Sequence, residues 1–271
     1  MSTKPAYQFG KYQPFVSDKM RQRPKLSKII NSVFGYTAMG AYGRQLIFKK
    51  LLNYVPMDKV RTIMDLGCGQ GEFSFMLADA HKDAVIDAVD LDTHAINKIQ
   101  KTIDHFRIEN LRAYNVPIEK VEKKDYYDLI FSVDVFEHIK VENMPFNECY
   151  RKLKKGGYLI IKMPNKVHQT ILPNSWFEEF NEWQEDEHIG QVYDLPDLTK
   201  RFEDEGFKIV TSFYSDGIIA RAGWEFNYIM MKGGSIMHLI SLPISKGLMK
   251  IDKLFRHKKK GNYIQVVGQK L

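Results

Sequence analysis

The sequence predicts an α/β fold with a doubly wound, mainly parallel sheet. Short apolar stretches alternate with stretches of helical periodicity over most of the chain. Parallel strands joined through helices need right-handed crossovers, which place helices on both faces of the sheet. A glycine-rich turn at residues 67–71 follows the first strand-like stretch, and ligands of such sheets bind at the carboxyl ends of the strands. The length of 271 residues suits one domain with additions.

The chain before the sheet is basic and partly helical. Residues 1–24 are polar, basic and interrupted by proline, which predicts a partly ordered N-terminal arm. Apolar-periodic stretches at 26–33 and 46–52 predict helices that cover the sheet. The predicted domain spans 25–271, with an insertion at about 217–260 between the last two strands.

Strands and helices are then expected in alternating order. The strands are expected at residues 61–66, 84–90, 111–116, 127–133, 157–162, 207–213 and 262–268, and the helices at 72–81, 93–106, 141–154 and 195–205. The segment Lys154–Gly157 predicts a helix end directly before a buried strand. Ser175 has capping-box spacing and would start a helix with Trp176, Phe180 and Trp183 on one face. This stripe fits either a substrate lid or ordinary core packing.

The net charge of +7 is unevenly distributed. Residues 1–61 hold 12 Lys and Arg against Asp18 and Asp58, and residues 246–271 hold 8 against Asp252. The segment between them is therefore acidic. The basic ends suit anionic lipid, phosphorylated glycan or RNA, and solvated tails that only supply solubility explain them equally well.

Composition and cysteine usage indicate a globular protein of a reduced compartment. Hydrophobic residues make up 44% of the chain and charged residues 27%, as in soluble domains generally. Cys68 lies in the glycine turn and Cys149 in a helix-like stretch, so no disulfide is expected. The first residues lack an apolar targeting segment, and no apolar run has the length of a membrane span. We therefore expect a cytoplasmic protein.

The most specific pattern of the chain is a strand ending in Asp65 that runs into three alternating glycines, Gly67, Gly69 and Gly71. Such glycines permit a tight turn and a close approach of the backbone to a ligand at the start of the next helix. The dinucleotide fingerprint requires a glycine where this chain has Glu72. A pyrophosphate would meet that carboxylate, so the pattern argues against a NAD-type ligand.

The Asp-x-Gly-x-Gly-x-Gly pattern, together with a second strand that ends in Asp90, resembles motif I and its partner acid in the class I S-adenosylmethionine-dependent methyltransferases. The resemblance covers about residues 42–215 and the last strand. It implies a Rossmann-like sheet of seven strands whose last strand is antiparallel, and S-adenosylmethionine as the cofactor.

The resemblance also implies which residues contact the cofactor. They are Asp65, Gly67, Cys68 and Gly69 along the methionine part, Asp90 and Leu91 at the ribose and adenine, Ile118 and Glu119 near the adenine edge, and Ser132 at the end of the fourth strand. The usual Asp-(Ala/Ile)-Glu after the third strand reads Pro117-Ile118-Glu119 here. The acid that commonly receives the adenine amino group is therefore missing.

Residues after the fourth strand bear on catalysis. Asp134, Glu137 and His138 resemble the Glu-x-x-Glu-His of quinone-pathway O-methyltransferases and small-RNA 2′-O-methyltransferases, which place a divalent metal near the acceptor oxygen. Spacings of i, i+3 and i+4 would put the three side chains on one helical face, with His188 as a further ligand. His138 could instead be a catalytic base, or the motif could be purely structural. The Asn/Asp-Pro-Pro-Tyr/Phe motif of amino-methylating enzymes is absent.

The insertion contains a basic amphipathic segment. Its apolar stripe is formed by Ile236, Ile240, Ile244, Leu248, Ile251 and Phe255, with Lys246, Lys250 and Lys253 opposite. Such a segment predicts peripheral contact with a membrane surface through 236–260. A helix that packs its stripe on the domain and leaves its lysines in solvent is the alternative.

These patterns together predict a methyltransferase that O-methylates a small-molecule, glycan or lipid-linked acceptor. Two alternatives remain open. An RNA methyltransferase would use the basic ends, and a non-catalytic partner protein would keep only the cofactor pocket.

Overall fold

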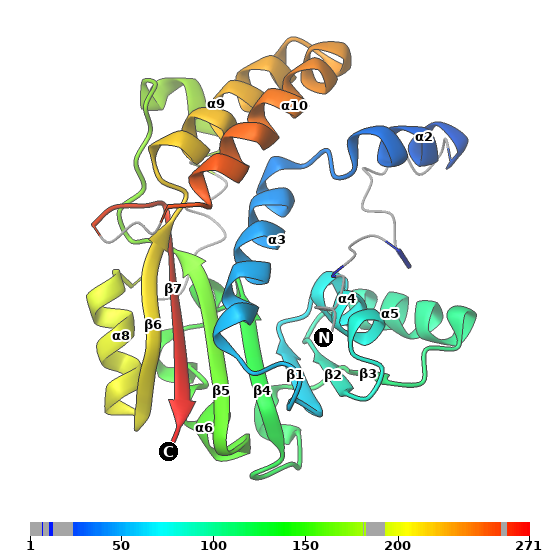
Figure 1. The fold of residues 1–271 in the computed structure, drawn as a ribbon, viewed down its shortest axis with the longest axis vertical. Coiled ribbons are helices and arrows are strands. Elements are labelled where there is room, and N and C mark those ends of the chain that lie inside the picture. The colour runs from blue at the N-terminus through cyan, green and yellow to red at the C-terminus, as the bar shows by residue number, and fades with distance from the viewer. Residues whose placement is uncertain (1–6, 8–10, 13–23, 181, 183–192, 256–258) are drawn as a thin grey trace.

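A computed structural model describes residues 7, 11–12, 24–180, 182, 193–255 and 259–271. One mixed sheet of seven strands has the order β3-β2-β1-β4-β5-β7-β6. Its strands are β1 (Thr62–Leu66), β2 (Val85–Val89), β3 (Leu111–Tyr114), β4 (Tyr127–Val133), β5 (Leu153–Pro164), β6 (Phe207–Ser215) and β7 (Tyr263–Lys270). Only β7 is antiparallel to its neighbours β5 and β6 within this sheet (Figure 1). The predicted Rossmann-like sheet with an antiparallel last strand is confirmed.

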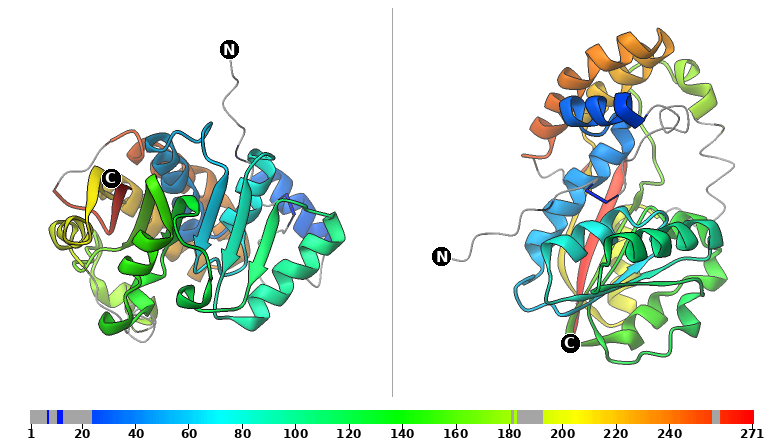
Figure 2. Two further views of the ribbon diagram at one scale, coloured as in Figure 1. Left: turned by 90° about the horizontal axis from the view of Figure 1, so that it is seen from below. Right: turned by 90° about the vertical axis from the view of Figure 1, so that its right-hand side faces the viewer.

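Helices cover both faces of the sheet (Figure 2). They are α2 (Pro24–Phe34), α3 (Met39–Leu51), α4 (Glu72–Ala80), α5 (Thr93–Phe106), α6 (Phe146–Lys152), α8 (Leu195–Asp204), α9 (Ile218–Lys232) and α10 (Ser235–Asp252). On one face, the ring centroids of Phe48 from α3 and Phe131 from β4 are 4.7 Å apart. On the other, Phe146 of α6 lies 5.7 Å from Phe202 of α8. α3 is the N-terminal helical cover that the sequence predicts.

Local signals in the sequence start and end these helices. α5 begins after Asp92, whose carboxylate accepts the backbone N–H of His94 at 2.8 Å and of Ala95 at 3.2 Å. It ends at Arg107, which has a left-handed backbone. α8 begins in the same way after Asp194, which accepts the N–H of Asp197 at 2.9 Å. Such caps satisfy N–H groups that have no partner inside the helix.

Two predicted helices differ from the structure. The helix expected at 141–154 is split into the 3-10 turn η4 (Val141–Asn143) and α6, because Pro145 restricts the residue before it and ends the first turn. The segment Lys154–Gly157 is not a helix end, since β5 already begins at Leu153, which pairs with Tyr127. The predicted capping box at Ser175 lies in another 3-10 turn, η5 (Asn174–Phe177), and Trp183 lies outside the described residues.

The segment between β6 and β7 forms a hairpin of α9 and α10 beyond the carboxyl ends of the parallel strands (Figure 1). The two helices pack closely because Gly223 of α9 has no side chain. A Cβ there would lie 2.8 Å from the carbonyl oxygen of Ser245 in α10. Asn227 donates to Ser241 Oγ across the same interface at 2.7 Å. The hairpin and α3 therefore form a helical cap over the edge of the sheet where ligands bind in this architecture.

Candidate active site

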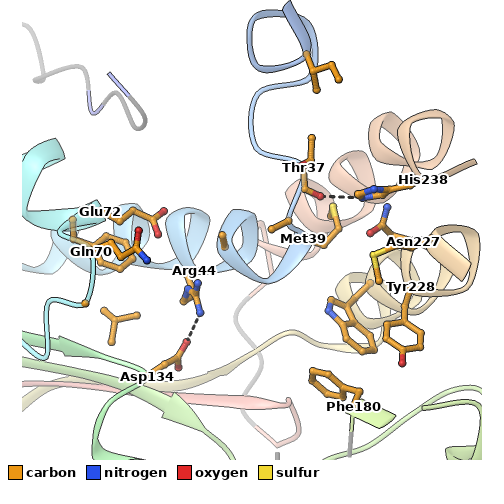
Figure 3. Close-up of a pocket in the computed structure, with 18 of the residues that line it drawn as sticks. Thr37, Met39, Arg44, Gln70, Glu72, Asp134, Phe180, Asn227, Tyr228 and His238 are labelled. Carbon is orange, nitrogen blue, oxygen red and sulfur yellow. Dashed lines mark hydrogen bonds and ion pairs between the residues drawn. The ribbon is translucent and has the colours of Figure 1, made fainter. Parts of the chain in front are cut away.

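A cavity of about 1000 Å³ lies between the glycine turn, α3 and the helical cap. The glycine turn supplies one wall, including Asp65, Gly67, Gly69 and Glu72, and the cap supplies the opposite wall, including Trp224 and Tyr228. Figure 3 shows Glu72 at one side, Phe180 and Tyr228 at the other, and Arg44 between them. Four of the predicted cofactor residues, namely Asp65, Gly67, Cys68 and Gly69, line this cavity.

The glycine turn has a backbone that other residues rarely adopt. Gly67 and Gly71 have φ values of 73° and 78°, in the left-handed region that favours glycine. The N–H of Gly67 donates to Val89 O at 2.9 Å, which ties the turn to β2. A Cβ on Gly67 would lie 2.4 Å from both Cγ atoms of Val135. Both the backbone conformation and the space at this position therefore require glycine.

Asp65 is the buried acid of the turn. Ser74 Oγ donates to its carboxylate at 2.5 Å. Burial, assisted by the nearby charges of Asp90 and Glu72, raises the pKa of Asp65 to about 7 although the bond from Ser74 opposes the rise. An ammonium group bound beside Asp65 would favour the ionised form.

Asp90 connects the turn with the end of β2. Its carboxylate accepts the N–H of Gly69 at 2.7 Å and that of Asp92 at 2.9 Å. Leu91, which follows it, is 71% exposed. A carboxylate held by two backbone donors keeps free lone pairs for ribose hydroxyls, so its placement fits the predicted role.

The five other predicted cofactor residues, Asp90, Leu91, Ile118, Glu119 and Ser132, do not line this cavity. Ile118 is buried in the core that includes β1 and β4, and Glu119 is exposed in the 3-10 turn η2 (Ile118–Lys120). Ser132 Oγ donates to Leu66 O at 2.9 Å and so links β4 to β1. Ser132 thus has a structural partner, and contacts of these residues with the cofactor remain predictions.

The predicted placement of Asp134, Glu137 and His138 on one helical face is wrong, whereas their role as metal ligands remains a prediction. Asp134 has a φ of 54° and precedes η3 (Phe136–His138), the short 3-10 turn that holds Glu137 and His138. Lys162 Nζ donates to both carboxylate oxygens of Asp134, at 2.6 and 2.7 Å. Glu137 is buried and His138 is exposed. His188 lies outside the described residues.

No three His, Cys, Asp or Glu side chains gather as a potential metal site within the part of the chain that is described. The carboxylate of Asp134 is instead neutralised by the buried Lys162, whose ammonium lies 3.4 Å from the ring centroid of Tyr263. His138 does not line the cavity. The proposed base role of His138, and any catalytic role of His188, remain predictions.

Arg44 is a site residue that sequence reasoning missed. It lines the cavity from α3, with its guanidinium 3.7 Å from Asp134, and Gln45 beside it donates to Glu72 at 2.6 Å. Arg44 therefore places a cation in the same cavity as the acids Asp65 and Glu72. The methionine part of S-adenosylmethionine carries both a carboxylate and an ammonium, and this pair of opposite charges fits it. Arg44 belongs to no sequence motif, so the sequence did not indicate that it is a site residue.

Aromatic side chains form the far wall of the cavity. Trp224 and Tyr228 of α9 are stacked with ring centroids 5.2 Å apart, and Phe180 lies 4.7 Å from Trp224. We refer to Phe180, Trp224 and Tyr228 as the aromatic wall. The sequence stripe that predicted Phe180 and Trp176 on one face was incomplete, because Trp176 is half exposed and two members of the wall come from the insertion.

The fold, the glycine turn and the paired acids define a class I S-adenosylmethionine-dependent methyltransferase. A family model described as a methyltransferase domain matches residues 39–212, and the chain belongs to this family. It is 26% identical over 141 residues to trans-aconitate 2-methyltransferase of Agrobacterium fabrum, which covers 49% of this chain and 53% of that protein. It is 31% identical over 103 residues to malonyl-[acyl-carrier protein] O-methyltransferase 2 of Ilyobacter polytropus, which covers 38% and 39%.

An N-methyltransferase is also similar. (S)-coclaurine N-methyltransferase of Thalictrum flavum subsp. glaucum is 26% identical over 129 residues, covering 44% of this chain and 34% of that protein. The chain thus spans about a third to a half of the length of these relatives. Phosphoethanolamine N-methyltransferase 2 of Haemonchus contortus, solved with S-adenosyl-L-methionine, has a TM-score of 0.58 at 19% identity over 90% of this chain and 59% of that chain. At 19% identity, this similarity indicates a shared fold only.

Cofactor affinity should depend on pH through Asp65. Because burial raises its pKa to about 7, the empty protein holds a proton there below that pH, and binding a cationic ligand must release it. We expect the affinity for S-adenosylmethionine to fall as the pH drops from about 8 to about 6, by up to roughly tenfold per unit below 7. Calorimetry in buffers of different ionisation enthalpy measures the released proton. An Asp65→Asn variant should bind more weakly and lose this dependence, and equal wild-type affinity at both pH values would contradict the assignment.

Proposed function

We propose that the protein O-methylates an amphipathic acceptor, either a small molecule or a lipid-linked glycan. The observation that carries this proposal is the continuity of the cavity, which joins the glycine turn to the aromatic wall without a break in its lining. A cofactor at the turn and an apolar or ring-shaped acceptor at the wall would then meet near Arg44 and Asp134.

The size and the lining of the cavity support two ligands. A volume of about 1000 Å³ lies at the upper end of the usual range for a single small-molecule site. The half that faces the cap is lined by the aromatic wall and by Ile30, Met231 and Leu239. Flat and aliphatic groups of that kind bind isoprenoid chains and the apolar faces of sugar rings.

For methyl transfer, the protein mainly has to align the methyl donor with the acceptor. S-adenosylmethionine, when bound, supplies a methyl group on a positively charged sulfur, which is already activated for displacement. The glycine turn and Asp90 would fix the donor end, while the aromatic wall would orient the acceptor for in-line attack. The acceptor hydroxyl must lose its proton, and the carboxylates that line the cavity are Asp65, Glu72 and Asp134. Of these, Asp134 lies 3.7 Å from Arg44, where the two ligands would meet.

A screen with labelled cofactor tests the proposal. Lipid-linked sugars, free glycans, small hydroxylated molecules and RNA would be compared as acceptors under the same conditions. We expect label in an acceptor that combines an apolar part with a hydroxyl. Transfer only to an amine, or only to RNA, would contradict the proposal.

Trp224→Ala should raise the KM for the acceptor about tenfold or more, because an aromatic side chain that covers a ligand contributes about 1.5–3 kcal/mol. Affinity for the cofactor should remain within twofold, since Trp224 lies on the far wall. Trp176→Ala is the matched control, because Trp176 is 50% exposed and does not line the cavity. Steady-state kinetics and cofactor calorimetry separate the two effects. An equal change of KM in both variants would remove the aromatic wall from the acceptor site.

A further inference from the structure

Helix α10 buries a mixed polar and apolar side. The side chains that it buries against the rest of the cap are Ser241, Leu242, Ser245, Met249 and Asp252. Ser241 accepts a hydrogen bond from Asn227, and Asp252 accepts the N–H of Gly217 at 3.2 Å. A helix on the surface of a globular domain normally buries most of its apolar residues, whereas α10 leaves all four of its isoleucines exposed.

The apolar side of α10 faces outward. Of the six predicted members of the stripe, Leu248 is only partly exposed and faces Gly223 of α9. The four isoleucines recur at helical spacing on the exposed side of α10, and Phe255 lies three residues beyond its end. These five residues are between 48% and 74% exposed. We refer to them as the α10 stripe: Ile236, Ile240, Ile244, Ile251 and Phe255. Single exposed apolar residues are common, but a continuous run along one helix marks a surface that another apolar phase covers. The alternative given above, a helix that packs this stripe on the domain, does not hold for these five residues.

The exposed charged side chains around the α10 stripe are positive. The only acids in the described part of 218–255 are Glu225 and Asp252, and both are buried. Glu225 accepts the N–H groups of Ile171 and Leu172 at 2.7 and 3.0 Å. Arg221 is also buried. The exposed cations of this region and of the residues that follow it are Lys232, Lys250, Lys259 and Lys260.

Two further observations refine this surface. Lys246 does not contribute to it, because its ammonium donates to Phe34 O and burial lowers its pKa to about 8. Exposed acids occur on the neighbouring segment, at Glu178 and Glu179. That segment packs through Phe177 on Trp224 and Tyr228, whereas α10 packs on the side of α9 that carries Gly223 and Asn227. These acids therefore lie away from the α10 stripe.

The helix α2 lies at the same end of the molecule (Figure 1). It contains no acid, and its Ile29 and Val33 are 60% and 68% exposed. The cavity also reaches this end, since Met231, Ser235 and His238 line it at the start of α10. The α10 stripe, the exposed lysines and the end of the cavity thus lie at one edge of the cap.

We propose that the α10 stripe docks the protein on the surface of an anionic lipid bilayer. The isoleucines would enter the boundary between headgroups and acyl chains, and the lysines would attract the anionic headgroups, as in other interfacial helices. No helix among the described residues has the length and hydropathy to cross a membrane, so the contact is peripheral. Delivery of a lipid-linked acceptor to the cavity rests on the proposed function, whereas docking itself does not.

Vesicle sedimentation of the full chain tests the proposal. We expect the protein to sediment with vesicles of phosphatidylglycerol and phosphatidylcholine at low salt, to remain in the supernatant with phosphatidylcholine alone, and to be released at high salt because exposed charges are screened. Lys250→Glu should weaken binding severalfold and reduce its dependence on salt. Full recovery in the supernatant with anionic vesicles at low salt would overturn the proposal.

Ile240→Asp should reduce the partition onto anionic vesicles at least tenfold, because it removes an apolar contact and adds a repelled charge. Leu271→Asp is the matched control: Leu271 is equally exposed, at 65% against 59%, but it lies at the far end of the sheet (Figure 1). The control should bind vesicles like the wild type. Equal binding of the two variants would assign the contact to charge alone and overturn the role of the stripe.

A second copy of the chain is the competing occupant of the α10 stripe. Sedimentation velocity over a range of concentrations would show a dimer that Ile240→Asp dissociates, and such a dimer without vesicle binding would contradict docking on lipid. Calorimetry with S-adenosylmethionine shows that the variants are folded. Vesicle binding without methyl transfer to any acceptor would refute the proposed function alone, and transfer without vesicle binding would refute docking alone.

Discussion

Replacement of Asp90 by alanine is expected to weaken the binding of S-adenosylmethionine and of its demethylated product by roughly ten- to a hundredfold. Loss of hydrogen bonds to a charged group typically costs about 1.5–3 kcal/mol. In this structure the carboxylate also accepts the N–H of Gly69 at 2.7 Å. The variant therefore loses both the ribose acceptor and one of the bonds that hold the glycine turn. Isothermal titration calorimetry measures the effect directly.

Asp92→Ala is a suitable control for this prediction. Asp92 is an acid two residues further on, but its carboxylate caps α5 through the N–H groups of His94 and Ala95. Its removal should lower the free energy of unfolding by about 1 kcal/mol and leave cofactor affinity nearly unchanged. Unchanged affinity in Asp90→Ala, or tighter binding of NAD than of S-adenosylmethionine, would contradict the site described above.

Gly67→Ala is expected to lower the free energy of unfolding by about 2–4 kcal/mol and to abolish measurable cofactor binding. The new Cβ would lie 2.4 Å from both Cγ atoms of Val135, and overpacking of this kind costs about 1–3 kcal/mol. The φ of 73° adds a further cost for any residue with a Cβ. Urea unfolding followed by fluorescence provides the measurement.

Two further variants isolate the steric part of this effect. Gly69 also has a positive φ, of 50°, but a Cβ there would meet no atom within 4 Å. Gly69→Ala should therefore cost only about 1 kcal/mol of stability. Adding Val135→Ala to Gly67→Ala removes the two closest atoms and should restore part of the loss. Equal stability of the Gly67→Ala and Gly69→Ala proteins would show that the clash is relieved by local movement.

Most of the sheet could be predicted from the sequence because its signals are local. The bounds of α5 and β4 agree with the predicted 93–106 and 127–133, since Asp92 caps the helix and the strand is mostly apolar, with Asp128 and Ser132 as its polar residues. The same holds for the glycine turn, where Gly67 and Asp65 act through the backbone of their own segment. The error at 141–154 arose where helical periodicity was counted across Pro145 and into β5.

The sequence by itself determined the succession of strands and helices along the chain, the glycine turn and the acids that flank it, because strand length, glycine spacing and helix caps are properties of neighbouring residues. Only the tertiary structure decided which partners the distant side chains find. Lys162, 28 residues away in sequence, pairs with Asp134, a partner that the sequence pattern did not indicate. Arg44 enters the cavity from α3, and the insertion supplies most of the aromatic wall. The outward direction of the α10 stripe was likewise set by packing, because Gly223 and Asn227 of α9 meet the opposite side of that helix at Ser245 and Ser241, and helical spacing alone does not say which side of a helix is buried.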